Sequence, residues 1–330
     1  MRTSFLHLAD VGLGYGLEAE PESFQRIAAQ FRFAVDHALD QRVSFVLFSG
    51  NLFDRPDVPP AAFQVALANL RLLAEKNVPA VAVQGRADLA AAGLGWYGVL
   101  AQEGLLAVLE PQPEETRQLR LRRWERRDGG GSYVDLTRCR VFGAHYYGAL
   151  SPRVLDAFSE ATRGLDNSEM DFRVLLLNAT VDPFSQSEAA SLSFSDLQFT
   201  RRQFDYVALG GTSTRYEAEH WAYNPGSDGF YYVMVDTAVE PKHQARFVEY
   251  PANLAVSRPA RARRREARRQ TIESLCDQLA IAGSSDAVQQ ALRRDVLRLA
   301  ASMLELHEES DLRHRVLDLS AAHPTGVHAP

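Results

Sequence analysis

Up to residue 83 the chain alternates short apolar runs with longer stretches of helical periodicity, and this alternation restricts the fold more than any other feature. The apolar runs lie at residues 4–9, 44–49 and 78–83. Between them, residues 21–41 and 59–76 carry apolar side chains at the three- and four-residue spacing of an amphipathic helix. This strand–helix order favours a largely parallel sheet with right-handed crossovers.

Downstream of residue 109 the pattern predicts a second, more antiparallel sheet. A glycine run at residues 129–131 is typical of a turn. Short apolar runs that we expect to be strands lie at residues 133–136, 140–143, 172–177, 206–209 and 229–236. Helical periodicity indicates short helices at residues 152–164 and 195–202. The sequence therefore predicts an α/β domain with two sheets.

A boundary is expected between Pro251 and Pro259, where the strand pattern ends. Beyond it we expect two amphipathic helices, at residues 261–281 and 286–306, with Gly283 between them. The chain is therefore predicted to consist of a first domain at residues 1–255, a helical segment at residues 256–320 and a disordered tail at residues 321–330.

The composition narrows the class of protein. The chain has 330 residues, of which 46% are hydrophobic and 24% charged, as in a globular domain with an appendage. Its net charge of -6 does not predict a generally basic surface for nucleic acid, although a local patch remains possible. Two cysteines, Cys139 and Cys276, are too few for a disulfide framework and favour a reducing compartment. We find no apolar run of membrane-spanning length and expect a cytoplasmic protein without membrane association.

Polar and glycine-rich motifs follow several of the predicted strands. They are Asp10 with Gly12, Gly50-Asn51-Leu52-Phe53-Asp54, Gly85-Arg86-Ala87-Asp88, Leu177-Asn178-Ala179-Thr180 and Gly210-Gly211-Thr212-Ser213. In α/β sheets the loops at the carboxyl ends of the strands are where ligands bind. Metal-assisted hydrolysis of a phosphodiester needs two cations about 3.5–4 Å apart, held by carboxylate, imidazole and amide ligands. These loops are therefore the candidate site, although their residue types depart from such a ligand set.

The order and form of these motifs resemble the calcineurin-like metallophosphoesterases, and within them the SbcD-type subunits of DNA double-strand-break repair exonucleases. The segments that support the resemblance are residues 8–14, 48–54, 175–181, 204–210 and 224–227. The resemblance implies a four-layer αββα sandwich of two mixed sheets with a helical C-terminal extension. It also implies a family that uses two Mn²⁺ or Mg²⁺ ions to cleave DNA.

Carried onto this chain, the resemblance places the first metal at Asp10 and at the positions held by Gly12 and Ser213. Asn51 stands where the family has the aspartate that bridges both metals. Glycine offers no side-chain ligand, and asparagine keeps the shape of aspartate without the negative charge that holds two dications together. Among these positions Asp10 keeps the family's ligand.

The resemblance places the second metal's other ligands at Arg86, Asn178 and Gly211, and the catalytic histidine at Ala87. Arg86 puts a permanent cation where a dication would bind, because a guanidinium is not deprotonated in a protein. We therefore expect no bound metal cofactor and an inactive or severely impaired centre.

Further residues are expected to support the site. Asp54 and Asp88 close two of the motifs, and His145 is a candidate to line the cleft. We also expect Arg86 to pair with Asp10 or Asp54 in place of the missing metal, which would keep their charges tolerable in the pocket.

On this interpretation the chain is an SbcD-like subunit that no longer cleaves DNA but binds DNA ends or an SbcC-type ATPase, with a homodimer also possible. Two alternatives remain open. One is an active phosphodiesterase or 3′–5′ DNA exonuclease with an altered or single-metal site at Asp10, Asp54, Asn51 and Asn178. The other is a scaffold without a role on DNA that acts only through its helical tail.

Arginines cluster at the expected start of the C-terminal helices, at Arg261, Arg263, Arg264, Arg265, Arg268 and Arg269. Positive charge is unfavourable at a helix N-terminus, so a bound polyanion or an acidic partner would relieve it. The cluster is therefore either a solvated helix start or a contact to nucleic acid or a partner.

Overall fold

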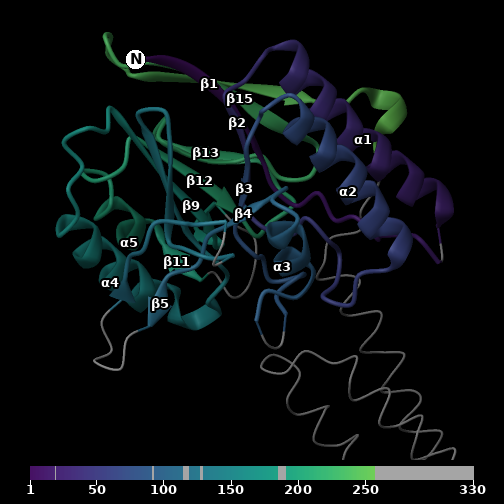
Figure 1. Ribbon diagram of the computed structural model, residues 1–330, viewed down its shortest axis with the longest axis horizontal. Helices are drawn as coiled ribbons and strands as arrows, with labels where there is room; N and C mark the ends of the chain where they lie inside the picture. The colour runs from purple at the N-terminus through teal and green to yellow at the C-terminus, as the bar shows by residue number, and fades with distance from the viewer. Residues whose placement is uncertain (19, 91–92, 114–118, 127–128, 185–190, 257–330) are drawn as a thin grey trace, which may run out of the picture. The chain divides into compact units, whose positions relative to one another are not determined.

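Figure 1 shows the computed structural model, which describes residues 1–18, 20–90, 93–113, 119–126, 129–184 and 191–256. The chain divides into two compact units, and these residues fall in the first, Met1–Val256. The predicted C-terminal helices, the arginines at positions 261–269 and the predicted tail lie outside the described residues. The predicted domain boundaries and the helical extension therefore stay predictions.

The first sheet has six strands in the order β16-β15-β1-β2-β3-β4. Its strands are β1 (Arg2–Leu8), β2 (Phe45–Phe48), β3 (Ala80–Ala82), β4 (Ala107–Val108), β15 (Gly229–Asp236) and β16 (His243–Glu249). Strands β1 to β4 are parallel, whereas β15 pairs antiparallel with both β1 and β16. The parallel part confirms the strand–helix alternation predicted from the sequence.

Helices cover the outer face of this sheet (Figure 1). They are α1 (Pro21–Asp40) and α2 (Pro60–Glu75), while α3 (Gly95–Gln102) lies between β3 and β4 in the chain. Both α1 and α2 begin with proline, whose fixed φ and missing N–H suit the first helical position. Ile27 and Phe31, one turn apart on α1, are fully buried in the same cluster as Leu8 and Phe48 of the sheet. Burial of each such side chain stabilises the fold by about 1.5–3 kcal/mol.

The second sheet also has six strands, in the order β13-β14-β12-β9-β8-β7. Its strands are β7 (Tyr133–Leu136), β8 (Cys139–Ala144), β9 (Phe172–Asn178), β12 (Tyr206–Gly210), β13 (Tyr216–Ala218) and β14 (Ala222–Asn224). Helices α4 (Ser151–Arg163) and α5 (Phe194–Gln198) bury Leu155, Phe158 and Leu197 against its outer face. The two sheets with helices outside confirm the predicted α/β sandwich.

The prediction that this second sheet is more antiparallel was wrong. Strands β8, β9, β12 and β14 pair parallel, and antiparallel pairs occur where β7 and β13 join at the two edges. The reason is the same as in the first sheet: α4 and α5 carry the chain back between successive strands, which then run in one direction.

The placement of residues 229–236 was also wrong, because they form β15 in the first sheet and not a strand of the second. Their partner, β1, lies at the other end of the described chain, with Arg2 opposite Asp236. Periodicity indicates a strand but carries no information on a partner so distant in sequence.

Shorter elements connect these layers. They are β5 (Gln112–Pro113), β6 (Leu119–Arg120), β10 (Val181–Asp182), β11 (Leu192–Ser193) and the 3₁₀ turns η1 (Gly148–Leu150) and η2 (Ala252–Leu254). In the described part of the chain, no helix has the length and apolar character needed to cross a membrane.

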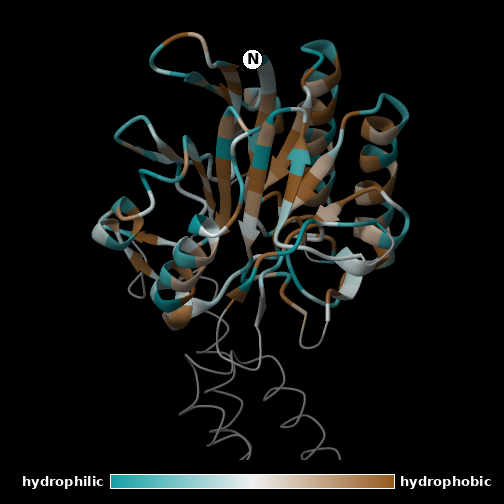
Figure 2. Cartoon of the chain, turned by 60° about the vertical axis from the view of Figure 1, so that its left-hand side comes forward, coloured by the Kyte–Doolittle hydropathy of each residue, from teal (hydrophilic) through white to brown (hydrophobic). Residues whose placement is uncertain are grey.

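The space between the sheets is filled by side chains that alternate along the strands. On β1, Leu6 and Leu8 pack with the helices, whereas Phe5 packs between the sheets with Tyr206. Figure 2 shows the apolar residues concentrated along the strands. At Gly210 a Cβ atom would lie 2.0 Å from the carbonyl oxygen of Ser49, so the ends of β12 and β2 meet without room for a side chain.

Candidate functional site

The predicted motifs converge where the parallel strands of the two sheets end. Backbone bonds join the first two loops: Asp10 N–H donates to Gly50 O at 3.2 Å, and Gly12 N–H donates to Asn51 O at 2.9 Å. Asp10, Gly12 and Asn51 all have left-handed φ values of 53°, 67° and 56°, which Gly, Asn and Asp adopt most readily. We name as the candidate centre the residues Asp10, Asn51, Arg86, Ala87 and Asn178.

Two glycines let these loops approach each other closely. A Cβ atom on Gly50 would lie 2.4 Å from Asn178 Nδ2 and 2.7 Å from the Gly85 Cα atom. A Cβ atom on Gly85 would lie 2.2 Å from Asn51 Oδ1. Both positions therefore require glycine, and the loops after β2, β3 and β9 form one packed unit.

The side chain of Asn51 joins two members of the candidate centre and is only 2% exposed. Its Nδ2 group donates to Asp10 Oδ1 at 2.5 Å, and its Oδ1 atom accepts from the backbone N–H of Ala87 at 2.8 Å. A carboxylate only accepts and a backbone N–H only donates, so these partners fix the direction of the amide. The amide therefore presents a donor to Asp10, where a bridging aspartate would present an oxygen.

Asn178 at the end of β9 joins the two sheets and is completely buried. Its Nδ2 group donates to the Ser49 carbonyl at 2.7 Å, and its Oδ1 atom accepts from the Arg86 backbone N–H at 3.3 Å. The amide oxygen, the atom that would bind a cation, is thus engaged within the protein.

Arg86 is half-buried, and its guanidinium carbon lies 5.9 Å from the centroid of the Tyr146 ring. This is a cation–π arrangement. Asp54 is also half-buried, and its backbone N–H donates to Leu13 O at 2.9 Å, which fixes the turn after β2. Pairing of Arg86 with Asp10 or Asp54 stays a prediction.

The last motif forms a separate turn beside the candidate centre. Gly211 has a φ of 104°, and a Cβ atom there would lie 3.4 Å from Asn178 Oδ1. The Ser213 carbonyl accepts from Ser227 N–H at 3.1 Å, and the buried Asn224 donates to two carbonyls of the same turn. Gly211 thus adjoins Asn178, whereas Ser213 contributes its backbone to the turn.

Asp88 lies beneath the centre as a buried anchor. Its carboxylate accepts from Gly85 N–H at 2.7 Å, Phe53 N–H at 3.1 Å and the Tyr97 hydroxyl at 2.6 Å. Burial raises the pKa of Asp88 to about 6, against the hydrogen bonds that favour its charged form. Tyr97 was not predicted from the sequence, because nothing in its helical segment indicates a hydroxyl directed at this loop.

His7 is a second buried anchor and lies between the two sheets. Its Nδ1 atom is 3.0 Å from the Tyr206 hydroxyl, and its Nε2 atom is 2.9 Å from Ser49 Oγ and 3.1 Å from Leu209 O. Burial lowers the pKa of His7 to about 3, so the ring is neutral at pH 7. The neutral ring ties β1 to β2 and β12 just below the candidate centre.

His145 follows β8 and lies next to Tyr146, the ring that Arg86 contacts. It stacks on Tyr147 with a centroid distance of 4.1 Å and an interplanar angle of 23°. Burial lowers the pKa of His145 to about 4, so its contact with Glu110, 3.4 Å from Nδ1, is not an ion pair at neutral pH. That His145 lines the cleft stays a prediction.

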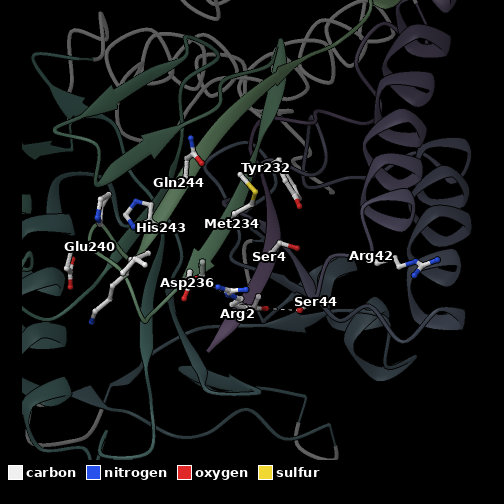
Figure 3. Close-up of a pocket in the computed structure, with 15 residues that line it drawn as sticks. Arg2, Ser4, Arg42, Ser44, Tyr232, Met234, Asp236, Glu240, His243 and Gln244 are labelled. Carbon is white, nitrogen blue, oxygen red and sulfur yellow. Dashed lines mark hydrogen bonds and ion pairs between the residues drawn. The ribbon is translucent and has the colours of Figure 1, made fainter.

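A surface hollow of about 820 Å³ lies away from the candidate centre, beside β1, β15 and β16 (Figure 3). Arg2, Tyr232 and Lys242 are among its lining residues, which include none of the predicted site positions. Arg2 pairs with Asp236 at 2.8 Å, and Lys242 pairs with Asp205 at 3.0 Å, so both of these cations are paired.

The residues of the candidate centre do not fit a pair of divalent cations. Asp10 supplies a carboxylate, but its Oδ1 atom accepts from Asn51, and the amide oxygens of Asn51 and Asn178 accept backbone N–H groups. Within the ranges that the structure describes, no group of three or more His, Cys, Asp or Glu side chains is arranged to hold a metal ion. We therefore derive no metal-dependent step for this centre.

Comparisons with known proteins support the resemblance seen in the motifs. No family model matches the chain. The chain is 29% identical over 215 residues to the DNA double-strand break repair protein Mre11 of Aeropyrum pernix, which covers 62% of this chain and 47% of that protein. It is 32% identical over 105 residues to the Mre11 protein of Archaeoglobus fulgidus, covering 32% of this chain and 24% of that protein. The chain thus spans about half or less of the length of these relatives.

Two solved structures are similar to this chain. One is TT1561 of Thermus thermophilus, with 16% identity and a TM-score of 0.41 over 75% of this chain and 99% of that chain. The other is the calcineurin-like phosphoesterase YfkN of Bacillus subtilis, with 9% identity and a TM-score of 0.48 over 78% of this chain and 93% of that chain. The sequence relatives confirm the resemblance predicted from the motifs.

Proposed function

We propose that this chain, a relative of the Mre11 DNA double-strand break repair proteins, is a catalytically inactive or severely impaired nuclease subunit that binds DNA ends and an SbcC-type ATPase. One hydrogen bond supports the loss of catalysis most directly. The Asn51 amide stands at the position of a bridging ligand and donates to Asp10 over a distance of 2.5 Å. Two dications near each other need an anionic bridge between them. A neutral amide that presents its donor end opposes such a pair.

The charge at Arg86 supports the same conclusion. Its backbone N–H bonds Asn178, so the side chain starts within the candidate centre. A permanent guanidinium there repels a dication. This repulsion weakens only slowly with distance, because the site is half-buried. Ala87, at the position of the family's catalytic histidine, has no side chain that transfers a proton to a leaving group.

The proposed role on DNA rests on the relatives, which are named as DNA double-strand break repair proteins. The proposed ATPase partner rests on the resemblance of the motifs to SbcD-type subunits. The fold supports binding without cleavage, because the loops of the candidate centre are held by their own hydrogen bonds and hold their positions without a metal. A homodimer and a contact through the arginines at positions 261–269 are part of the same proposal.

The test measures metal content and cleavage in the purified full chain. Manganese bound per chain is determined by mass spectrometry after dialysis against Mn²⁺, and cleavage is followed on end-labelled duplex DNA. We expect no stoichiometric manganese and no Mn²⁺-dependent cleavage, with the same background in Asp10→Ala. Clear cleavage that Asp10→Ala abolishes would instead support the alternative of an active phosphodiesterase with an altered or single-metal site.

Binding is tested separately in EDTA, with the full chain titrated against labelled duplex ends and against an SbcC-type ATPase. We expect both complexes to form without metal. If the chain binds the ATPase but no DNA, the scaffold alternative replaces the role on DNA ends.

A further inference from the structure

Consecutive aromatic residues lie beside the candidate centre, in the segment that follows β8. The rings of His145 and Tyr147 stack on each other, whereas the Tyr146 ring faces Arg86. The backbone N–H of Tyr146 donates to Gln84 O at 3.1 Å, which fixes this segment against the loop after β3. All three residues are half-buried, so part of this segment is open to solvent.

We infer that Tyr146 and Arg86 form a binding site for an unpaired nucleotide, whose base stacks on the Tyr146 ring and whose phosphate pairs with the Arg86 guanidinium. This inference rests on the proposed role at DNA ends and adds the form of nucleic acid that the site selects. Arg86 stands at a position that the resemblance gives to a metal ligand, whereas Tyr146 stands at none of those positions.

The chemistry of the two side chains selects a nucleotide. An aromatic ring offers a face on which any base can stack, and a planar guanidinium offers paired donors to a phosphate. The guanidinium need not be unpaired beforehand, because its five N–H donors can serve a phosphate and a second partner together. A ligand with only a phosphate would use Arg86 but gain nothing from the ring.

The same chemistry selects an unpaired base over a paired one. Inside a duplex both faces of a base are covered by its neighbours, so stacking on a protein ring requires a base outside the helix. The half-buried Tyr146 ring is held by its backbone and by Arg86, so it is ordered before a base arrives. Such preorganisation reduces the entropy lost on binding.

The stacked rings of His145 and Tyr147 flank Tyr146 in the chain and support this arrangement. The contact between the two rings, with centroids 4.1 Å apart, restricts the backbone on both sides of Tyr146. Because His145 is neutral at pH 7, the positive charge offered to the ligand by this group of residues comes from Arg86.

The chain contains a matched control for the Tyr146–Arg86 pair. Arg246 lies over the Tyr232 ring with 5.7 Å between the guanidinium carbon and the ring centroid. Tyr232 lies on β15 beside the hollow in Figure 3 and contacts His37 of α1, away from the loops of the candidate centre. Tyr232→Leu therefore removes the same chemistry at a place where no nucleotide is proposed.

The experiment uses fluorescence anisotropy with the full chain in EDTA. The probes are a blunt duplex, the same duplex with a 3′ overhang of adenine nucleotides, and the same overhang with abasic nucleotides. We expect the adenine overhang to bind about tenfold more tightly than the other two probes, from stacking of about one base. Tyr146→Leu should abolish this preference, while Tyr146→Phe, which keeps the ring, and Tyr232→Leu should keep it.

Arg86 is tested by its own pair of variants. Arg86→Gln should weaken binding of the adenine overhang, and Arg86→Lys, which keeps the charge without the planar fork, should restore it only in part. Competition with dAMP separates the two sources of an unpaired nucleotide. If dAMP displaces the labelled overhang probe as well as the same concentration of unlabelled overhang does, the free nucleotide is the ligand. If the unlabelled overhang competes much more strongly than dAMP, the ligand is a strand end.

Some outcomes overturn the inference and leave the proposed function intact. If blunt and overhanging ends bind equally, or if Tyr146→Leu keeps the preference, the nucleotide site is refuted while end binding stands. If only Arg86→Gln weakens binding, the site holds a phosphate alone and the inference fails. If Mn²⁺-dependent cleavage is found but Tyr146→Leu still removes the overhang preference, the inactive-subunit proposal fails and the nucleotide site remains. Thermal unfolding of each variant shows whether it is folded.

Discussion

Two layers of polar side chains lie where the strands end, and they differ in exposure. Asp10 and Arg86 of the outer layer are half-buried, whereas both residues of the inner layer are buried. The outer layer is the candidate centre, in which Asn51 and Asn178 use both amide atoms to hold neighbouring loops. The inner layer contains Asp88 and His7, which are buried and hold the same loops from below. The comparison teaches that the shape of this site depends on hydrogen bonds within the protein, so the loops can keep their positions without metal ligands.

The largest effect is expected where the loops touch. Gly50→Ala should destabilise the protein by at least about 3 kcal/mol, because its Cβ atom would meet Asn178 and Gly85 at a left-handed φ of 93°. Gly93→Ala is the control, since Gly93 also has a positive φ of 61° but has nothing within 4 Å of an added Cβ atom. Urea unfolding of both variants separates contact from backbone strain. Equal losses would mean that the loops are not closely packed.

The inner layer should give the next largest effect. Asp88→Asn should cost about 2–3 kcal/mol, because one amide end would place a donor against the donors of Gly85, Phe53 or Tyr97. Tyr97→Phe removes a hydroxyl that also accepts from Leu52 N–H, and should cost about 1–2 kcal/mol. Chemical denaturation measures both. A loss below about 0.5 kcal/mol for each would contradict the anchoring role assigned to this layer.

The pH dependence of stability should distinguish the two inner anchors, because burial lowers the pKa of His7 and raises the pKa of Asp88. His7 has a folded pKa of about 3 against 6.5 when unfolded, so the stability present above pH 6.5 is lost as the pH falls. The loss approaches about 1.4 kcal/mol per pH unit well below pH 6.5. Asp88 has a folded pKa of about 6 against 3.8, so protonation stabilises the fold as the pH falls below 6.

Unfolding free energies measured between pH 7.5 and pH 5 test this difference. The wild type should lose stability on acidification, since His145 is shifted in the same direction as His7. His7→Gln should flatten the curve, and Asp88→Asn should steepen it below pH 6. Parallel curves for all three proteins would show that neither buried group titrates as described.

The smallest effect is expected from a charge added to the outer layer. Asn51→Asp places a second carboxylate beside Asp10 in place of an amide donor, and the repulsion should destabilise the protein by about 1 kcal/mol at pH 8. Mn²⁺ should not restore the stability of this variant while Arg86 remains. A rise in melting temperature with Mn²⁺ in Asn51→Asp alone would show that the outer layer is closer to a metal site than proposed.

Much of the fold could be predicted because it depends on local periodicity. The apolar runs and the helical patterns before residue 83 correspond to β1, α1, β2, α2 and β3. The direction of the strands in the second sheet and the position of β15 could not be predicted, because they depend on which strands pair. β1 and β15 pair through residues as distant as Arg2 and Asp236.

The candidate site was predictable in part. The motifs placed Asp10, Asn51 and Asn178 at strand ends, and the structure brings these ends together. Tyr97 and Tyr146 were not predicted as parts of the site, because their roles arise from contacts to Asp88 and Arg86 that no local pattern indicates.

The sequence by itself determined which chemical groups stand at the candidate centre, since Asp10 provides a carboxylate and alanine, asparagine and arginine provide none in any environment. Only the tertiary structure decided how those groups are used: the Asn51 amide faces Asp10, the Asn178 amide spans the two sheets, and His7 is buried and neutral. The reason is physical. Hydrogen-bond direction and burial depend on partners that lie far apart in the chain and come together only when the sheets pack.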